Sequence, residues 1–204
     1  MAHQNTYSRR TFQALRITCI VTVTVVVAAA GPVFAQGTGQ AEVAVGFLRN
    51  IGGTMQGVNV QAALPLGEHW HLVGEINRST GADCSGCEPQ FRDTSILGGA
   101  RYSWYPSRSA SPFWQVLVGG LHSKADDYSL EYCCGLGTRL HPGYTIDYLA
   151  FQPGGGVTFT VTPRFGIRAQ ADALIGIPDQ REWEGISIFP RVVVTGVIRL
   201  GRTR

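Results

Sequence analysis

The sequence predicts an all-β fold, an eight-stranded antiparallel up-and-down barrel that crosses a membrane. The first observation is an alternation with a period of two, seen best over residues 165–172, where apolar side chains alternate with glycine or polar ones. Such alternation is typical of a strand whose two faces meet different surroundings. The second observation is that short and long connections alternate along the chain. The third is that aromatic residues gather beside the short connections.

Eight alternating segments make up the predicted barrel. In chain order they cover about residues 42–48, 55–64, 70–78, 94–105, 113–122, 147–159, 165–172 and 191–201. One face of each segment is apolar, as with Val43, Val45 and Phe47 in the first. From the second segment onward, the opposite faces carry Asn59 and Gln61, Glu75 and Asn77, Ser95 and Arg101, Gln115, Gln152 and Thr158, Arg168 and Asp172, and Arg191 and Arg199. A tilted membrane strand needs ~9–11 residues, so eight such strands suit the length of the chain.

The connections between these segments differ in length in a regular way. The long ones cover residues 79–93, 123–146 and 174–190, and the short ones cover 65–69, 106–112 and 160–164. In outer-membrane barrels the short turns lie on the periplasmic side and the long loops lie outside. Residues 49–54 depart from this scheme, because they are short where a long loop is expected.

Residues 1–35 are predicted to be a signal peptide, and residues 36–204 the barrel domain. Arg9, Arg10 and Arg16 form a basic start, residues 17–30 are almost wholly apolar, and a small-residue cleavage site ends at Ala35. The alternative is a membrane anchor, but the apolar run is shorter than the ~20 residues that a spanning helix needs. The paired arginines resemble a twin-arginine export signal. The very apolar stretch 21–30 favours Sec export instead.

The charge of the mature chain excludes a nucleic-acid-binding role. The signal segment holds three of the 17 Lys and Arg residues and none of the 14 Asp and Glu residues, so the remainder is balanced. The basic isoelectric point therefore comes from the leader, and no basic patch is left that favours nucleic acid.

Aromatic residues indicate which face of the strands meets lipid. Those beside the short connections are Trp70, Tyr102, Trp104, Tyr105, Phe113, Trp114, Phe159 and Phe165. Tryptophan and tyrosine favour the membrane–water interface, so we predict an aromatic girdle that includes Trp70, Trp104, Trp114 and Phe165. The alternative is a soluble periplasmic barrel that holds an apolar ligand, with its charged face outside. The export signal, the loop lengths and the aromatic rim together favour the membrane barrel.

A membrane barrel turns the polar faces of its strands inward. The predicted polar network of the lumen contains Glu75, Arg101, Arg168, Asp172, Arg191 and Arg199. Eight strands leave room for side chains to fill the interior but not for a wide channel. We therefore expect a barrel filled by paired charges rather than a conducting path.

The mature chain has four cysteines, which are Cys84, Cys87, Cys133 and Cys134. Because exported proteins meet an oxidising compartment, disulfides are expected, and pairing between the two loops is preferred over small or vicinal rings. A zinc site is the alternative, but Cys133 and Cys134 lack the spacing that such a site needs. No metal and no cofactor is predicted.

The chain resembles the small eight-stranded outer-membrane barrels of the OmpA, OmpX and opacity-protein type. The residues that carry the resemblance are Gly154–Phe159, Thr160–Arg168, Leu64–Gly67 and Val73–Glu75. It implies a cell outer-membrane location, contact with membrane lipid and lipopolysaccharide, insertion by the outer-membrane machinery, and a structural or surface-interaction role for the loops. Two features depart from the family pattern: the chain ends on Arg204 rather than an aromatic residue, and Pro153 predicts a bulge within a strand.

Some barrels of this kind modify lipids with a histidine, a serine and an acid near the outer rim. Here His122 and Ser123 lie at the end of a predicted strand. Adjacent strand residues point to opposite faces, so the two are poorly arranged as partners. His122 with Ser129 across the loop stays open as an alternative, and no catalytic residues are predicted.

Overall fold

The computed structural model describes residues 40–51, 53–81, 91–105, 109–125, 128–131, 138–141, 143–179 and 185–200. The predicted signal peptide, residues 1–35, and the four cysteines of the mature chain lie outside these ranges. Within the described ranges, no helix is long and apolar enough to span a membrane.

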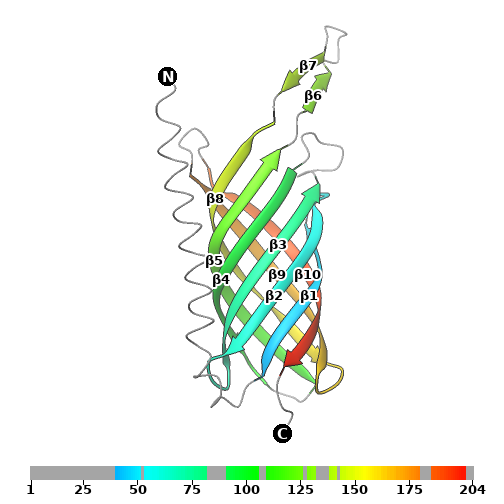
Figure 1. Cartoon of the computed structure of the whole chain (residues 1–204), viewed down its shortest axis with the longest axis vertical. Coiled ribbons are helices and arrows are strands. Elements are labelled where there is room, and N and C mark those ends of the chain that lie inside the picture. Colours follow the sequence, from blue (N-terminus) through cyan, green and yellow to red (C-terminus); the bar gives the residue numbers. More distant parts are fainter. Residues whose placement is uncertain are drawn as a thin grey trace. The chain divides into compact units, whose positions relative to one another are not determined.

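Eight strands close into one antiparallel barrel (Figure 1). They are β1 (Ala41–Asn50), β2 (Gln56–Pro65), β3 (Trp70–Gly81), β4 (Phe91–Ser103), β5 (Ala110–Ala125), β8 (Thr145–Thr160), β9 (Phe165–Pro178) and β10 (Ser187–Leu200). Each strand pairs with the next barrel strand along the chain, and β1 closes the barrel on β10 with Ala41 opposite Leu200. The predicted fold class is therefore confirmed.

The two ends of the barrel differ in how the strands are connected. At the short-turn end, residues 66–69, 104–109 and 161–164 join β2 to β3, β4 to β5 and β8 to β9. The other connections lie at the opposite end, which we call the long-loop end (Figure 1). One of them holds a second, two-stranded sheet of β6 (Tyr128–Glu131) and β7 (Thr138–His141), in the segment 123–146 for which only a loop was expected.

Several strands are longer at the long-loop end than the alternation predicts. β5 and β8 have 16 residues each, and β9 continues to Pro178 before β10 begins at Ser187. The third long connection is therefore shorter than expected. The extra residues of β9 and β10, such as Leu174, Ile175 and Phe189, are apolar on both faces, so no alternation marks where these strands end or begin.

The apolar faces of the strands point outward and the polar faces point inward. The outward side chains of Val45, Ile76 and Leu149 are 53%, 52% and 55% exposed, whereas the inward Gln61 and Glu75 are each 1% exposed. A soluble barrel would show the reverse arrangement. The exterior is therefore suited to lipid, and the alternative of a soluble barrel with an apolar interior does not fit.

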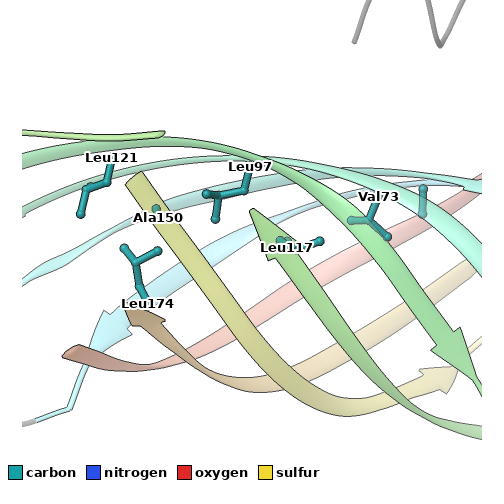
Figure 2. Close-up of a cluster of buried hydrophobic side chains, with 7 residues drawn as sticks. Val73, Leu97, Leu117, Leu121, Ala150 and Leu174 are labelled. Atoms are coloured by element: carbon teal, nitrogen blue, oxygen red, sulfur yellow. The ribbon is translucent and has the colours of Figure 1, made fainter. Parts of the chain in front are cut away.

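Part of the interior is nevertheless apolar. Figure 2 shows side chains from β3, β4, β5, β8 and β9 that point into the barrel. The buried cluster consists of Ala63, Val73, Leu97, Leu117, Leu121, Ala150 and Leu174, with Tyr148 and Phe189 packed against it. The expected polar lumen is thus interrupted by a packed hydrophobic core.

β4 and β5 approach each other too closely for inward side chains at two positions. A Cβ atom on Gly99 would lie 2.1 Å from the carbonyl oxygen of Val116, and one on Gly119 would lie 2.1 Å from that of Ile96. Both positions face the interior and both obstacles are backbone atoms. Glycine is required here because of the close approach of the two strands.

Pro153 does not produce the predicted bulge. β8 keeps one register with β9 on either side of it, with Phe151 opposite Ile175 and Gly154 opposite Asp172. Pro153 also stays opposite Val116 of β5. The proline therefore interrupts the pairing between β8 and β9 only locally, and β8 does not contain the extra residue that a bulge requires.

Candidate functional site

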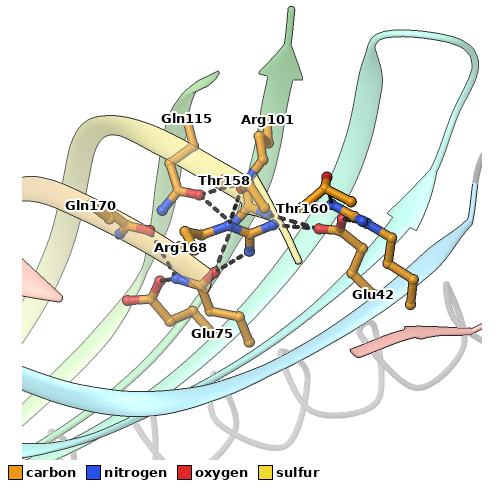
Figure 3. Close-up of polar contacts among 10 residues, drawn as sticks. Glu42, Glu75, Arg101, Gln115, Thr158, Thr160, Arg168 and Gln170 are labelled. Atoms are coloured by element: carbon orange, nitrogen blue, oxygen red, sulfur yellow. Dashed lines mark hydrogen bonds and ion pairs between the residues drawn. The ribbon is translucent and has the colours of Figure 1, made fainter. Parts of the chain in front are cut away.

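Near the short-turn end of the interior, one carboxylate lies among three arginine side chains (Figure 3). Glu42 accepts a hydrogen bond from Nη2 of Arg168. Its carboxylate oxygens also lie 3.6 Å from Nη1 of Arg101 and 3.4 Å from Nε of Arg199. Glu42 comes from β1, and the three arginines come from β4, β9 and β10. A single acid thus holds together four strands across the lumen.

Amide side chains link these arginines to the barrel wall. Nη2 of Arg101 donates to Oε1 of Gln61 at 2.7 Å and to Oε1 of Gln115 at 2.8 Å. Arg168 donates to the same Gln61 oxygen at 3.1 Å and to the hydroxyl of Thr158 at 2.9 Å. Because buried guanidinium groups need several acceptors, the amides complete what one carboxylate cannot supply.

An aromatic ring lies within this part of the network. The guanidinium groups of Arg101 and Arg168 lie 4.7 Å and 5.2 Å from the centre of the Phe113 ring. Phe113 is 6% exposed and points inward, whereas its neighbour Trp114 points outward. The expectation that Phe113 joins the aromatic rim is therefore wrong, and its ring instead makes cation–π contacts with the buried arginines.

A second acid, Glu75, occupies the middle of the interior. Its carboxylate accepts hydrogen bonds from Gln61 at 2.7 Å, Asn77 at 2.6 Å and Gln152 at 3.0 Å. Nη2 of Arg191 lies 3.6 Å from it. The two halves of the network meet at Gln61, which contacts Arg101 and Arg168 on one side and Glu75 on the other.

Arg191 and Asp172 form the closest ion pair on the long-loop side of the network. The two side chains approach to 2.7 Å, and Nε of Arg191 donates to Asp172 at 2.8 Å. Gln170 donates to the same carboxylate at 2.8 Å and accepts from Gln61 at 3.2 Å. The described lumen therefore contains one continuous set of polar contacts that reaches from Glu42 to Asp172.

The charges that point into the described barrel are balanced. The inward cations are Arg101, Arg168, Arg191 and Arg199, and the inward carboxylates are those of Glu42, Glu75, Asp93 and Asp172. Of the residues assigned to the lumen from sequence, Glu75, Arg101, Arg168, Asp172 and Arg191 are buried, and the side chain of Arg199 is 15% exposed. Equal numbers of opposite charges remove the need for counter-ions in the interior.

The four aromatic residues assigned to the girdle lie on the exterior at the short-turn end. Trp70, Trp104, Trp114 and Phe165 are 43%, 60%, 50% and 54% exposed. The ring of Trp70 lies 5.5 Å from that of Trp114, edge to face. Together with the apolar wall, these rings form the surface that a membrane barrel presents at one interface.

Comparison with known proteins supports this interpretation at the level of fold. No family model and no curated protein sequence matches the chain. Among solved structures, it is similar to the attachment invasion locus protein Ail of Yersinia pestis in complex with the heparin analogue sucrose octasulfate, at 14% identity over 79% of this chain and 99% of that chain, with a TM-score of 0.51. The chain has the fold of the small outer-membrane β-barrels.

Two further barrels align over similar lengths with lower scores. Neisserial surface protein A is 14% identical over 79% of this chain and 94% of that chain, with a TM-score of 0.48. The N-terminal β-barrel domain of Pseudomonas aeruginosa OprF is 15% identical over 80% of this chain and 100% of that chain, with a TM-score of 0.44. The outer-membrane location predicted from the sequence agrees with the fold and with the apolar exterior.

Around the short turns of the barrel lies a second group of rings. The ring of His69 lies 5.4 Å from that of Tyr102 and 5.9 Å from that of Tyr105, and Nδ1 of His69 lies 3.0 Å from the carbonyl oxygen of Ser103. Burial raises the pKa of the Tyr105 hydroxyl, and the negative charge of Glu42 raises it further. The phenol therefore stays neutral and suits the interface between water and lipid.

Toward the long-loop end, the interior of the barrel holds a cavity of about 10 Å³. Its polar lining consists of Asn50, Asn77, Ser79, Asp93, Ser95 and Arg191. Oδ1 of Asn50 has no hydrogen-bond partner among the described residues. A cavity of this size holds about one water molecule, so it is not a ligand pocket.

His122, the residue considered for catalysis, lies on the lipid-facing side of the barrel near the long-loop end. Its Nδ1 lies 2.7 Å from a carboxylate oxygen of Asp147, on the neighbouring strand β8. Ser123 points into the barrel and is 9% exposed, so it lies on the opposite face, as the alternation predicts. The described residues also contain no group of three or more His, Cys, Asp or Glu side chains arranged for a metal ion.

Sequence reasoning missed Glu42 and Phe113 as members of the network, and it placed Gln115 on the inward face without identifying it as an acceptor for Arg101. The phase of the first strand identifies Glu42, because Val43, Val45 and Phe47 define the outward face and leave even-numbered residues inside. The inward turn of Phe113 follows from the same phase rule applied from Gln115. The contacts across the lumen have no such signal, because they join strands that are not neighbours in the sheet.

Proposed function

We propose that this chain is a non-conducting outer-membrane barrel whose role is to hold its long connections at the cell surface. The observation that carries the proposal is the filled interior. The network from Glu42 to Asp172 and the apolar cluster around Leu117 both lie across the lumen. Because a conducting path needs continuous water, a lumen packed in this way favours a structural scaffold over a pore.

A role at the surface draws support from the long-loop end. The strands there exceed the length that spanning requires, since β5 and β8 have 16 residues each against a need of ~9–11. The additional sheet of β6 and β7 lies in the connection between them. Ail, which shares the fold, carries attachment and invasion in its name. The name of Ail supports contact at the cell surface in general and no particular partner for this chain.

Conductance in planar bilayers tests the filled barrel. The protein is refolded without residues 1–35, and current is recorded at a range of voltages. We expect no steady current above background. A steady channel of nanosiemens size would overturn the proposal. A barrel with Glu75→Ala and Arg191→Ala is the positive control, because it removes two side chains from the middle of the lumen.

Display at the surface is tested separately on intact cells. An epitope inserted between β6 and β7 should be labelled by antibody without permeabilisation, and one inserted in the short turn 161–164 should not. The reverse result would refute the proposed orientation. Cleavage after Ala35, insertion by the outer-membrane machinery and disulfides between Cys84, Cys87, Cys133 and Cys134 stay predictions.

A further inference from the structure

The barrel closes where β1, its first strand, pairs with β10, its last (Figure 1). We call this pairing the seam. A polar pair faces the interior near each end of the seam: Glu42 lies opposite Arg199, and Asn50 lies opposite Arg191. The stretch between the two pairs is mostly apolar, and its inward residues are Ala44, Gly46, Leu48, Val193, Thr195 and Val197.

The two polar pairs of the seam are joined in different ways. At the short-turn end, a carboxylate oxygen of Glu42 lies 3.4 Å from Nε of Arg199, so the strands are linked directly. At the long-loop end, Oδ1 of Asn50 accepts no hydrogen bond from the described residues, Arg191 included. Nη2 of Arg191 lies within ion-pairing distance of Asp172 but likewise makes no hydrogen bond to the described residues.

Both of these polar atoms are buried. Asn50 is 8% exposed and Arg191 is 3% exposed. Nδ2 of Asn50 donates to Sδ of Met55 at 3.5 Å. Because a thioether sulfur accepts hydrogen bonds and does not donate them, this contact leaves Oδ1 as the amide atom available on the other side. A buried acceptor and a buried donor on facing strands thus both lack a partner, which is unfavourable unless a third group joins them.

Asn50 and Arg191 both line the cavity near the long-loop end, whose volume of about 10 Å³ suits one water molecule. The guanidinium of Arg191 disfavours a metal cation there, and the carboxylate of Asp93 in the same lining disfavours an anion. A neutral molecule of the size of water fits both constraints. The apolar part of the lining consists of Leu121, Leu174 and Phe189.

We propose that a water molecule in this cavity joins β1 to β10, by donating a hydrogen bond to Oδ1 of Asn50 and accepting one from Nη2 of Arg191. A buried water needs two to four polar partners, and the lining offers further acceptors on Ser79, Asp93 and Ser95. The seam is then fastened at both ends, by an ion pair beside the short turns and by water at the long-loop end. This inference goes beyond the proposed scaffold role and does not depend on what the long connections contact.

A crystal structure of the unchanged protein, refolded without residues 1–35, tests the water directly at a resolution that shows ordered solvent. We expect one density peak within about 3.2 Å of both Oδ1 of Asn50 and Nη2 of Arg191. A direct hydrogen bond between the two side chains, with no peak, would overturn the proposal. An anomalous signal at the peak from crystals soaked in rubidium chloride would assign the site to a cation and overturn it as well.

Urea unfolding of two seam variants provides a second test. Thr195→Val is the matched control, because Oγ1 of Thr195 is also buried without a partner among the described residues but does not line the cavity. If Asn50 binds no water, both Asn50→Leu and the control remove an unsatisfied group, and neither lowers the stability. If the water is present, Asn50→Leu removes its acceptor and raises the unfolding equilibrium constant about fivefold, whereas the control does not.

Equal effects of the two substitutions would contradict the proposal. Met55→Leu measures how much of the loss comes from the contact between Asn50 and the thioether. A loss in Met55→Leu as large as that in Asn50→Leu would remove the stability evidence for the water. The heat-dependent gel shift verifies that each variant folds, and the crystallographic test requires no variant.

Discussion

Replacing Glu42 by Gln removes the only carboxylate within ion-pairing distance of Arg101, Arg168 and Arg199 among the described residues. The substitution keeps the size of the side chain and removes its charge. Breaking a buried pair by neutralising one partner costs about 3–5 kcal/mol, because the other charge stays buried. The Glu42 side chain is 15% exposed, so water screens part of the loss. We therefore expect the free energy of unfolding to fall by about 3 kcal/mol.

The measurement is urea unfolding of the barrel in lipid vesicles, followed by tryptophan fluorescence and extrapolated linearly to zero urea. Glu68→Gln is the control, since Glu68 is exposed in the short turn 66–69, and it should change stability by less than about 0.5 kcal/mol. A difference between the two variants below about 1 kcal/mol would refute the reasoning, because it would mean that the three arginines are satisfied without Glu42.

The remaining predictions concern the backbone, the histidine and the cysteines. Gly119→Ala should lower the free energy of unfolding by about 1–3 kcal/mol, because its methyl group would meet the carbonyl oxygen of Ile96. Gly120→Ala, one residue on and facing open space, should change it by less than about 0.5 kcal/mol. Equal losses for the two would contradict the close approach of β4 and β5. His122→Ala should leave the acylation of extracted envelope lipids unchanged by mass spectrometry, and altered acylation would restore the lipid-modifying alternative. An alkylating reagent should label none of Cys84, Cys87, Cys133 and Cys134 without reduction, whereas four labelled thiols would exclude the disulfides.

The barrel could be predicted from the sequence because its two faces meet solvents of opposite character. Each strand then repeats the same contrast, as with Gln61 between the outward Val60 and Ala62. The rule fails where that contrast is lost. Leu97 and Leu117 face inward although they are apolar, and the short strands β6 and β7 have too few residues to show a period.

The candidate site could be predicted only as a set of inward residues. Alternation places Arg168 inside but says nothing of its partner, since Glu42 lies 126 positions away in sequence. Such contacts depend on the stagger of strands around the closed barrel, and the stagger is set by turn geometry and by glycines such as Gly99 and Gly119. Pro153 shows the same limit, because a missing backbone donor predicts either a bulge or a local gap, and only the pairing of β8 with both neighbours decides between them.

The position of Glu42 also has a consequence for the order of folding. Its partners Arg168 and Arg199 come from β9 and β10, the last strands to be synthesised, and β1 meets β10 only when the barrel closes. Until then these arginines lack their acid, and an unpaired charge within a bilayer is strongly unfavourable. The penalty is removed in a single late event that joins the two ends of the chain. We therefore expect partly assembled sheets to be poorly populated, with closure of the barrel and completion of the network in one cooperative step.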